Sequence, residues 1–332
     1  MKIPEHDPRV ARNLEEVAPG IRRLRMPLEA SIDHSNVYLL RDGTGWCVFD
    51  TGADSNAARN IWSSALSGPL MEGVTRIIIS HHHCDHLGLA AWLQEITGAP
   101  VIVRPEELAI ARTIRLSDPS DEGAAREFLR RNGMQAEDVD ATVEIMKGFW
   151  ACAIPQETRE PEHGQRMAIG RYTFEVLVTG GHSIAQVALY EPSCGIFLSG
   201  DQMLERITSN IGLWVYGDTA PLANFFKSLD EIESREIRLV LPGHHGCYTT
   251  DGRLPGKLRA YHRKRLTVFR ERLKGEMTAF ELAIEVFGRF PDINNRILAL
   301  VETLAHMQWL QGNGSVVRRD GEHVSWYQRV AP

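Results

Sequence analysis

Four short clusters of histidine and aspartate supply the residues of this chain that could bind metal ions. The first cluster, His-His-His-Cys-Asp-His, comprises residues 81–86 and directly follows an apolar run that is typical of a buried strand. The others are Gly-Gly-His-Ser, Ser-Gly-Asp and Pro-Gly-His, which contribute His182, Asp201 and His244. Neutral imidazoles and carboxylates are ligands that zinc and other transition metals bind. The residue types therefore indicate a metal centre.

The spacing inside the first cluster separates candidate ligands from a bystander. Alternate residues at the end of a strand point to the same side, so His81 and His83 can share one ion while His82 points elsewhere. Asp85 and His86 lie just past the turn, where they can reach a second ion. Each later cluster has an ordinary structural interpretation by itself, such as a helix cap for an aspartate. Their order after the first cluster favours metal binding, because loops at one end of a sheet converge on one site.

The chemistry of such a centre is hydrolysis. Two metal ions about 3.5–4 Å apart can share one water molecule and lower its pKa towards about 7. The resulting hydroxide would attack an acyl carbon without a serine nucleophile, and the sequence contains no Gly-x-Ser-x-Gly motif. Asp201 and Asp85 are the candidate catalytic residues, since the first can hold the ion pair together and the second can orient the hydroxide. Zinc is the favoured metal, with iron and manganese as alternatives.

The elements that position these clusters alternate between strands and helices. Strands are predicted at residues 21–26, 35–40 and 46–50, after an irregular arm at 1–20, and the turn Asp42-Gly43 indicates a hairpin. Further strands are predicted at 75–80, 100–103, 172–178, 187–190, 196–199 and 239–241, and helices at 54–67, 87–97 and 222–234. This alternation predicts an α+β fold with four αββα layers. A helical insertion at about 105–150 is of the kind that caps active sites.

Residues 253–332 are predicted to form a separate unit after a catalytic domain at 1–252. Helices are expected at 258–273, at 279–287 behind a capping box of Thr278 and Glu281, and at 292–310. A hairpin follows, with strands at 315–319 and 322–328 around Asp320-Gly321. Three helices and a hairpin are the elements of a winged helix. This unit carries 14 Lys and Arg against 8 Asp and Glu, although the whole chain has a net charge of −6.

The first cluster resembles the His-x-His-x-Asp-His signature of the metallo-β-lactamase superfamily. Val-Phe-Asp-Thr-Gly at residues 48–52 and the three later clusters resemble its other motifs in the same order, over roughly residues 20–250. The resemblance implies that Asp201 bridges two metals and that Asp50 holds the metal loop without binding an ion. It implies two sets of three ligands: His81, His83 and His182 for the first metal, and Asp85, His86 and His244 for the second.

The bridging carboxylate indicates which branches of the superfamily the sequence resembles most. The best-known class of zinc β-lactamases has a cysteine at the position of Asp201, whereas the glyoxalase II, lactonase and ribonuclease branches have the carboxylate. The Asn-Pro-Phe-Leu-Arg stretch associated with glyoxalase II is not found, which argues against glutathione thioesters. The tail and residues 200–211 resemble the β-lactamase-like protein 2 type, whose tail is a winged-helix extension.

Three functions compete on this basis. A hydrolase of thioesters or related small acyl esters is favoured by the complete ligand set, and a lactone hydrolase would need the same centre. A single-strand endoribonuclease is the alternative that the basic tail raises, but the insertion is only some forty residues long and lies elsewhere than the second domain of nucleases. A non-catalytic binding protein is disfavoured by the intact ligands. His34 and Tyr216 are further candidates for substrate binding, the tyrosine as a donor to an oxyanion.

The remaining composition argues for a cytoplasmic protein. The N-terminus is charged throughout and has no apolar core of a signal peptide, and no run of about 18 apolar residues could cross a membrane. The five cysteines are scattered and form no Cys-x-x-Cys pair, which favours reduced thiols. The expected partner is a small acyl substrate, with nucleic acid as the less favoured alternative and no membrane, and a homodimer is compatible with the sequence.

Overall fold

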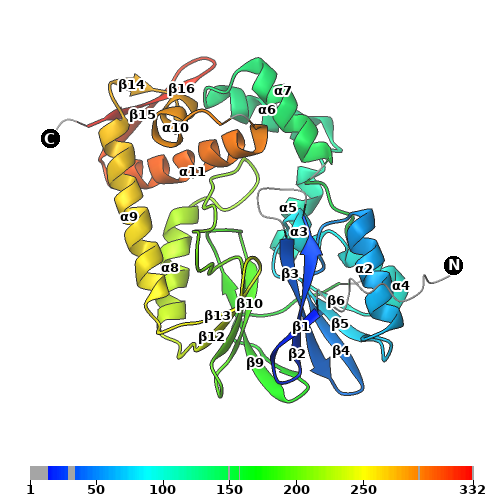
Figure 1. The fold of residues 1–332 in the computed structure, drawn as a ribbon. Helices are drawn as coiled ribbons and strands as arrows, with labels where there is room; N and C mark the ends of the chain where they lie inside the picture. Colours follow the sequence, from blue (N-terminus) through cyan, green and yellow to red (C-terminus); the bar gives the residue numbers. More distant parts are fainter. Residues whose placement is uncertain (1–13, 29–33, 149, 157, 291, 331–332) are drawn as a thin grey trace.

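The computed structural model describes residues 14–28, 34–148, 150–156, 158–290 and 292–330. Within these residues, two mixed sheets face each other and helices cover their outer faces (Figure 1). The first sheet has the strand order β1 (Leu14–Ala18), β2 (Ile21–Pro27), β3 (His34–Asp42), β4 (Gly45–Phe49), β5 (Val74–Ile78), β6 (Val101–Ile102) and β7 (Thr158–Arg159). The second has the order β13 (Tyr248–Thr249), β12 (Leu239–Pro242), β11 (Ile196–Gly200), β10 (Gln186–Glu191), β9 (Tyr172–Thr179) and β8 (Arg166–Ile169).

Three apolar layers hold this arrangement together. Between the sheets, side chains such as Phe49 from the first sheet and Phe174 and Leu198 from the second form one buried cluster. A second cluster joins the first sheet to α2 (Asn56–Ser67) and α4 (Ala90–Thr97), where Trp62 is completely buried. A third joins the second sheet to α8 (Pro221–Glu233) through Phe225. The predicted four-layer αββα fold is therefore confirmed.

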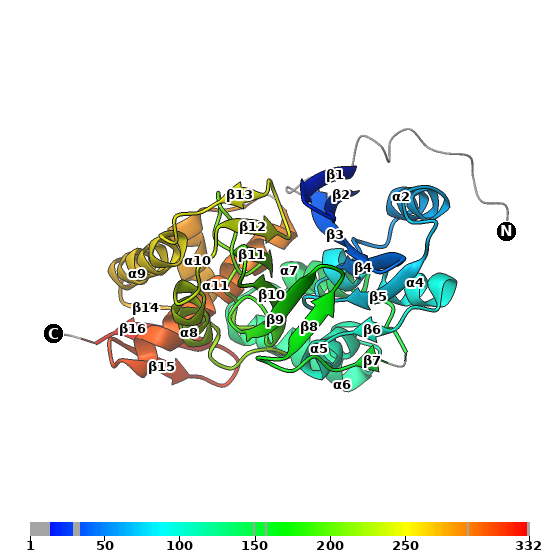
Figure 2. The same cartoon turned by 90° about the horizontal axis from the view of Figure 1, so that it is seen from below.

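The insertion and the C-terminal unit lie together over one end of the sheets (Figures 1 and 2). The insertion consists of α5 (Pro105–Ile114), α6 (Pro119–Arg131) and α7 (Ala136–Gly148). The C-terminal elements are α9 (Leu254–Arg272), β14 (Glu276–Met277), α10 (Ala279–Phe287), α11 (Ile293–Gly312), β15 (Val316–Asp320) and β16 (Ser325–Arg329). Val143 of α7 and Leu300 of α11 belong to one buried cluster, and Arg296 of α11 pairs with Asp138 of α7. The C-terminal unit is thus packed against the insertion.

Local sequence signals explain several boundaries. The pair Asp42 and Gly45 leaves a two-residue hairpin loop, in which Gly43 has φ 63°, a value that glycine adopts without cost. Thr278 and Glu281 form the predicted capping box at the start of α10. No helix in the described ranges is long and apolar enough to cross a membrane.

Three local expectations were wrong. Residues 14–18, expected to belong to an irregular arm, form β1 because they pair with β2, although none of their side chains is fully buried. Helix α9 begins at Leu254, four residues earlier than expected. The first turn of a helix tolerates its proline, because the N–H groups of that turn have no partner within the helix and proline lacks this group. The last hairpin pairs Asp320 with Ser325 around a four-residue loop rather than a two-residue turn.

Candidate metal centre

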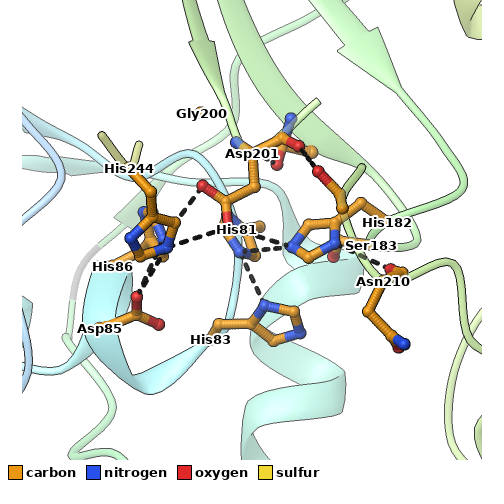
Figure 3. Close-up of polar contacts among 12 residues, drawn as sticks. His81, His83, Asp85, His86, His182, Ser183, Gly200, Asp201, Asn210 and His244 are labelled. Atoms are coloured by element: carbon orange, nitrogen blue, oxygen red, sulfur yellow. Dashed lines mark hydrogen bonds and ion pairs between the residues drawn. The ribbon is translucent and has the colours of Figure 1, made fainter. Parts of the chain in front are cut away.

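The sheets bring the predicted ligands together at one end of the strands (Figure 3). The first cluster follows β5, and its second half forms the short helix α3 (Cys84–Leu87). His182 follows β9, Asp201 follows β11 and His244 follows β12. Because β5 and these three strands belong to facing sheets, the site lies at the mouth of the sandwich. These three side chains are buried, which keeps bulk water from competing with them for an ion.

A first group consists of three imidazoles. His81 Nε2 lies 2.9 Å from His83 Nδ1 and 3.3 Å from His182 Nε2. These three side chains can each direct one ligand atom to a common point, since the ligand atoms all lie within 4.8 Å of one another. The geometry fits one ion with three nitrogen ligands, which leaves a position open for water or substrate.

A second group combines imidazoles with a carboxylate. His244 Nε2 lies 3.1 Å from Asp85 Oδ2, and His86 Nε2 lies 3.4 Å from the same oxygen. Their ligand atoms again lie within 4.8 Å of one another. The nitrogen and oxygen donors suit zinc, iron or manganese, so this group could hold a second ion.

Asp201 lies between the two groups. Its Oδ1 is 3.5 Å from His86 Nε2, and its Oδ2 is 3.5 Å from His182 Nε2 and 3.2 Å from His244 Nε2. One carboxylate therefore faces ligands of both groups, which is the position that a residue shared by two ions must occupy. Figure 3 shows Asp201 between the two sets of rings.

Two buried polar atoms support a metal at this point. His86 Nε2 and Asp201 Oδ1 are buried and have no hydrogen-bond partner among the described residues. A buried polar atom without a partner costs about 1–3 kcal/mol, so such atoms need an explanation. A cation coordinated by both would satisfy them, and the donor set therefore fits the metal that the sequence predicts.

The electrostatics of the two groups differ in a way that suits cations. Burial, together with the nearby His86, His83 and His182, holds the pKa of His81 well below its usual range, so its ring is neutral and can donate a lone pair. Burial opposes a charge on His244 as well, yet Asp201 and Asp85 raise its pKa to about 10. The carboxylates that favour a proton there favour a metal cation for the same electrostatic reason.

Asp50 organises the loop that carries the first ligands. It is buried, and its Oδ1 accepts a hydrogen bond from Ser80 N at 2.7 Å. Its Oδ2 accepts from Ser80 Oγ at 2.8 Å and lies 2.9 Å from His86 Nδ1. The same Ser80 Oγ lies 2.9 Å from His81 Nδ1. Asp50 thereby contacts His86 of the second group directly and His81 of the first group through Ser80.

Main-chain carbonyls orient two further rings. His182 Nδ1 lies 3.0 Å from the carbonyl oxygen of Asn210, and His244 Nδ1 lies 2.9 Å from that of His34. A carbonyl oxygen can accept a hydrogen bond only from a nitrogen that carries a hydrogen. Each Nδ1 is therefore protonated, and each Nε2 presents its lone pair to the site. His34 thus contributes its carbonyl to the centre, a role that its residue type could not reveal.

Glu107 is a functional candidate that the sequence reasoning missed. This completely buried residue of α5 accepts a hydrogen bond from His82 N at 3.0 Å, and its Oε2 lies 2.5 Å from His82 Nδ1. It also accepts from Ser183 Oγ at 2.5 Å and from Ala185 N at 2.7 Å. His82 therefore turns to the insertion, as the alternation of the strand end predicted. A glutamate in the first turn of a helix gives no sequence signal for such a role.

Tyr216 has a partner away from the ligands. Its hydroxyl donates to the carbonyl oxygen of Asp121 in α6, and its ring packs against the cluster that joins the insertion to the C-terminal unit. The contact links the segment after β11 to the insertion. A cavity of about 830 Å³ between α6, α7, α10 and the last hairpin contains none of the candidate ligands. The candidate metal centre therefore lies outside this cavity.

A third buried group, of His262, Glu302 and His306, has metal-like spacing but satisfied partners. His306 Nδ1 lies 2.7 Å from the carbonyl oxygen of Glu302, and His306 Nε2 lies 3.2 Å from His262 Nδ1. His262 Nε2 lies 2.9 Å from Thr208 Oγ1. Arg265 Nη1 lies 3.0 Å from the Glu302 carboxylate, where its charge opposes a cation. We assign this group to the support of the fold.

Comparison with known proteins agrees with this geometry. A beta-lactamase domain protein from Burkholderia ambifaria has a similar structure, with a TM-score of 0.86 and 31% identity over 96% of this chain and 94% of that chain. A metallo-beta-lactamase family protein from Thermus thermophilus has a TM-score of 0.83 and 29% identity, covering 95% of this chain and 100% of that one.

Sequence comparison gives the same result. The probable metallo-hydrolase YqjP of Bacillus subtilis is 23% identical over 308 residues, which are 88% of this chain and 92% of that protein. The model of the metallo-beta-lactamase superfamily matches residues 31–244, a range that includes every candidate ligand. With its facing sheets and its clustered ligands, the chain belongs to the metallo-β-lactamase superfamily.

Proposed function

We propose that this protein is a hydrolase that uses two divalent metal ions to cleave a thioester or a related small acyl ester. The observation that carries the proposal is the position of Asp201, whose Oδ1 faces His86 and whose Oδ2 faces His182. A carboxylate between two groups of ligands is what a two-ion centre requires. Zinc is our first choice of metal, with iron and manganese as alternatives.

Two ions in such a centre supply an activated water and polarise the carbonyl of the substrate. The chain's own residues would hold and orient the reactants. His81, His83 and His182 are the candidate ligands of one ion, and Asp85, His86 and His244 are those of the other. Asp85, whose side chain is 13% exposed, would accept a proton from the attacking water and keep it oriented. Burial of five other candidate ligands would exclude further water, namely His81, His86, His182, Asp201 and His244.

The packing of the C-terminal unit supports an acyl substrate over RNA. Arg265, the last residue of the basic triplet 263–265, forms an ion pair with Glu302. Arg259 forms ion pairs with Asp230 and Glu233 of α8. Part of the positive charge of α9 therefore fastens this unit to the rest of the protein. We further propose that the order α9, β14, α10, α11, β15, β16 is a winged helix used for packing. A lactone remains the alternative substrate for the same centre.

The test combines metal analysis with a substrate panel. The purified protein should hold about two transition-metal ions per chain, and Asp201→Ala should lose metal and hydrolysis together. Asp251→Ala, at an exposed position, is the matched control and should keep both. The panel contains thioesters, lactones, simple esters and single-stranded RNA. Salt-sensitive RNA binding with metal-dependent cleavage, and no turnover of any acyl substrate, would replace this proposal with a nuclease.

A further inference from the structure

The segment between β11 and α8 touches two candidate ligands at once. Ser209 Oγ donates a hydrogen bond to the carbonyl oxygen of Asp201, and the carbonyl oxygen of Asn210 lies 3.0 Å from His182 Nδ1. Figure 3 shows Asn210 beside His182, on the side of the ring that faces away from His81. The position of this segment therefore decides where His182 directs its Nε2.

The C-terminal unit holds this segment in place. Leu213 N donates to the carbonyl oxygen of Val301 at 2.9 Å, and Asn210 Nδ2 donates to that of Leu298 at 3.1 Å. The approach is close, because a Cβ added at Gly212 would lie 2.7 Å from Val301 Cγ2. Several residues of the segment are thus fastened to the face of α11.

Glu302 completes the attachment. Its Oε2 lies 3.4 Å from Asn210 Nδ2, and its Oε1 lies 3.0 Å from Arg265 Nη1 of α9. The guanidinium of Arg265 in turn lies over the ring of Phe287, 4.6 Å from its centroid. Glu302 is buried, so a contact to its carboxylate is poorly screened by water. The two carboxylate oxygens therefore join the C-terminal core to the side chain of Asn210.

We propose that Glu302 is a positioning residue of the metal centre, which acts through Asn210 on His182. This inference rests on the proposed two-metal function. It makes the C-terminal unit part of the support of the first ligand group. The second group has supports outside this unit, since Asp50 lies against His86 and the carbonyl of His34 against His244. Loss of Glu302 should therefore weaken the first ion more than the second.

The two ions must be distinguished before the effect can be assigned. Apo full-length protein is titrated with Co²⁺ against a chelator, and the two binding steps and the visible spectrum of each are recorded. His83→Ala should remove the step that belongs to the first group, and His244→Ala the step that belongs to the second. A wild-type protein that binds no Co²⁺ would refute the proposed function itself, and with it the basis of this inference.

Glu302→Ala and Asn210→Ala should each weaken the first step by about 10- to 100-fold, as loss of a residue that orients a ligand does. The second step should change by less than about 3-fold, because it depends on other supports. Glu302→Gln, which keeps an acceptor oxygen for Asn210, should lie between wild type and Glu302→Ala. Glu285→Ala, which removes the exposed pair with Arg272 in the same unit, is the control and should leave both steps unchanged.

A double variant tests whether Glu302 acts through Asn210. If it does, Glu302→Ala should have little further effect on the first step in the Asn210→Ala background, because the two residues share one contact. Additive effects would overturn the proposal, as would equal weakening of both steps or a lowered melting temperature with unchanged Co²⁺ binding. If Glu302→Ala fails to fold, Glu302→Gln and its double variant with Asn210→Ala decide the question by the same criteria.

Discussion

The carboxylate of Glu107 lies against His82, the one histidine of the first cluster that turns away from the candidate metal ligands. Oε2 of Glu107 accepts the main-chain N–H of His82 at 3.0 Å. Since His82 stands between His81 and His83, this bond holds the loop that carries both. The helical insertion therefore supports the metal loop from outside the sheets.

Glu107→Gln should weaken metal binding. Burial opposes ionisation of Glu107, but His82 and Ser183 hold its pKa below the usual range, so the folded protein contains a carboxylate surrounded by hydrogen-bonding groups. The amide of a glutamine would place an N–H donor where one of the surrounding donor groups needs an acceptor oxygen. We expect a loss of about 10-fold in metal affinity, measured by chelator competition. Glu106→Gln, whose side chain is 41% exposed on the same helix, is the control, and an equal effect in both variants would contradict this role.

His82→Ala should keep most of the bound metal. The substitution removes a ring that points to Glu107 but leaves the main-chain N–H that Glu107 also holds. His81→Ala and His83→Ala remove candidate ligands and should lose metal in elemental analysis. Equal metal loss in all three variants would show that the alternation of the strand end does not determine the ligands.

Gly243→Ala should disrupt the centre by steric conflict. A Cβ at this position would lie 2.2 Å from Asp201 Oδ1 and 2.7 Å from His86 Cε1, so the shared carboxylate would have to move. We expect metal content and hydrolysis to fall together. Gly246→Ala in the same loop is a matched control, because an added Cβ there meets nothing within 4 Å. A Gly243→Ala protein with the full metal content would refute the packing argument.

The free energy of unfolding should fall between about pH 6.5 and pH 4. Burial lowers the pKa of His262 to about 4, and burial together with His262 lowers that of His306 to about 3. In this window the unfolded chain binds protons at both histidines and the folded protein does not, so acidification favours unfolding. At pH 5, each histidine lowers the free energy of unfolding by on the order of 1–2 kcal/mol relative to its value above pH 6.5.

Two ionisable residues, Glu302 and Arg265, lie beside this histidine pair. Burial raises the pKa of Glu302 to about 7, which gives it the opposite sign: it stabilises the fold as pH falls through 7. The guanidinium of Arg265 lies 3.0 Å from the Glu302 side chain. His306→Gln removes one of the two histidines. In urea unfolding, the free energy of unfolding of this variant should fall less from pH 7 to pH 5 than that of the wild type. His323→Gln, at a side chain 84% exposed, should keep the wild-type difference. An unchanged difference in His306→Gln would contradict the assignment.

The sequence by itself determined which residues are the candidate ligands, because ligand chemistry is carried by residue types at short spacing. His81, His83, Asp85 and His86 lie within six residues, and the strand end that presents them is a local apolar run. The same holds for the capping box of Thr278 and Glu281, which needs only four residues. The layered fold followed from the alternation of such local elements.

The tertiary structure decided which distant residues support that set. Glu107 meets Ser183 across 76 positions and Glu302 meets Asn210 across 92, and neither glutamate differs in its local sequence from an ordinary helical surface residue. Strand β1 was missed for the same reason, since none of its side chains is fully buried and it is defined by its pairing with β2. Local propensity is set by neighbours in the chain, whereas burial and hydrogen bonding of these residues depend on how the whole chain packs.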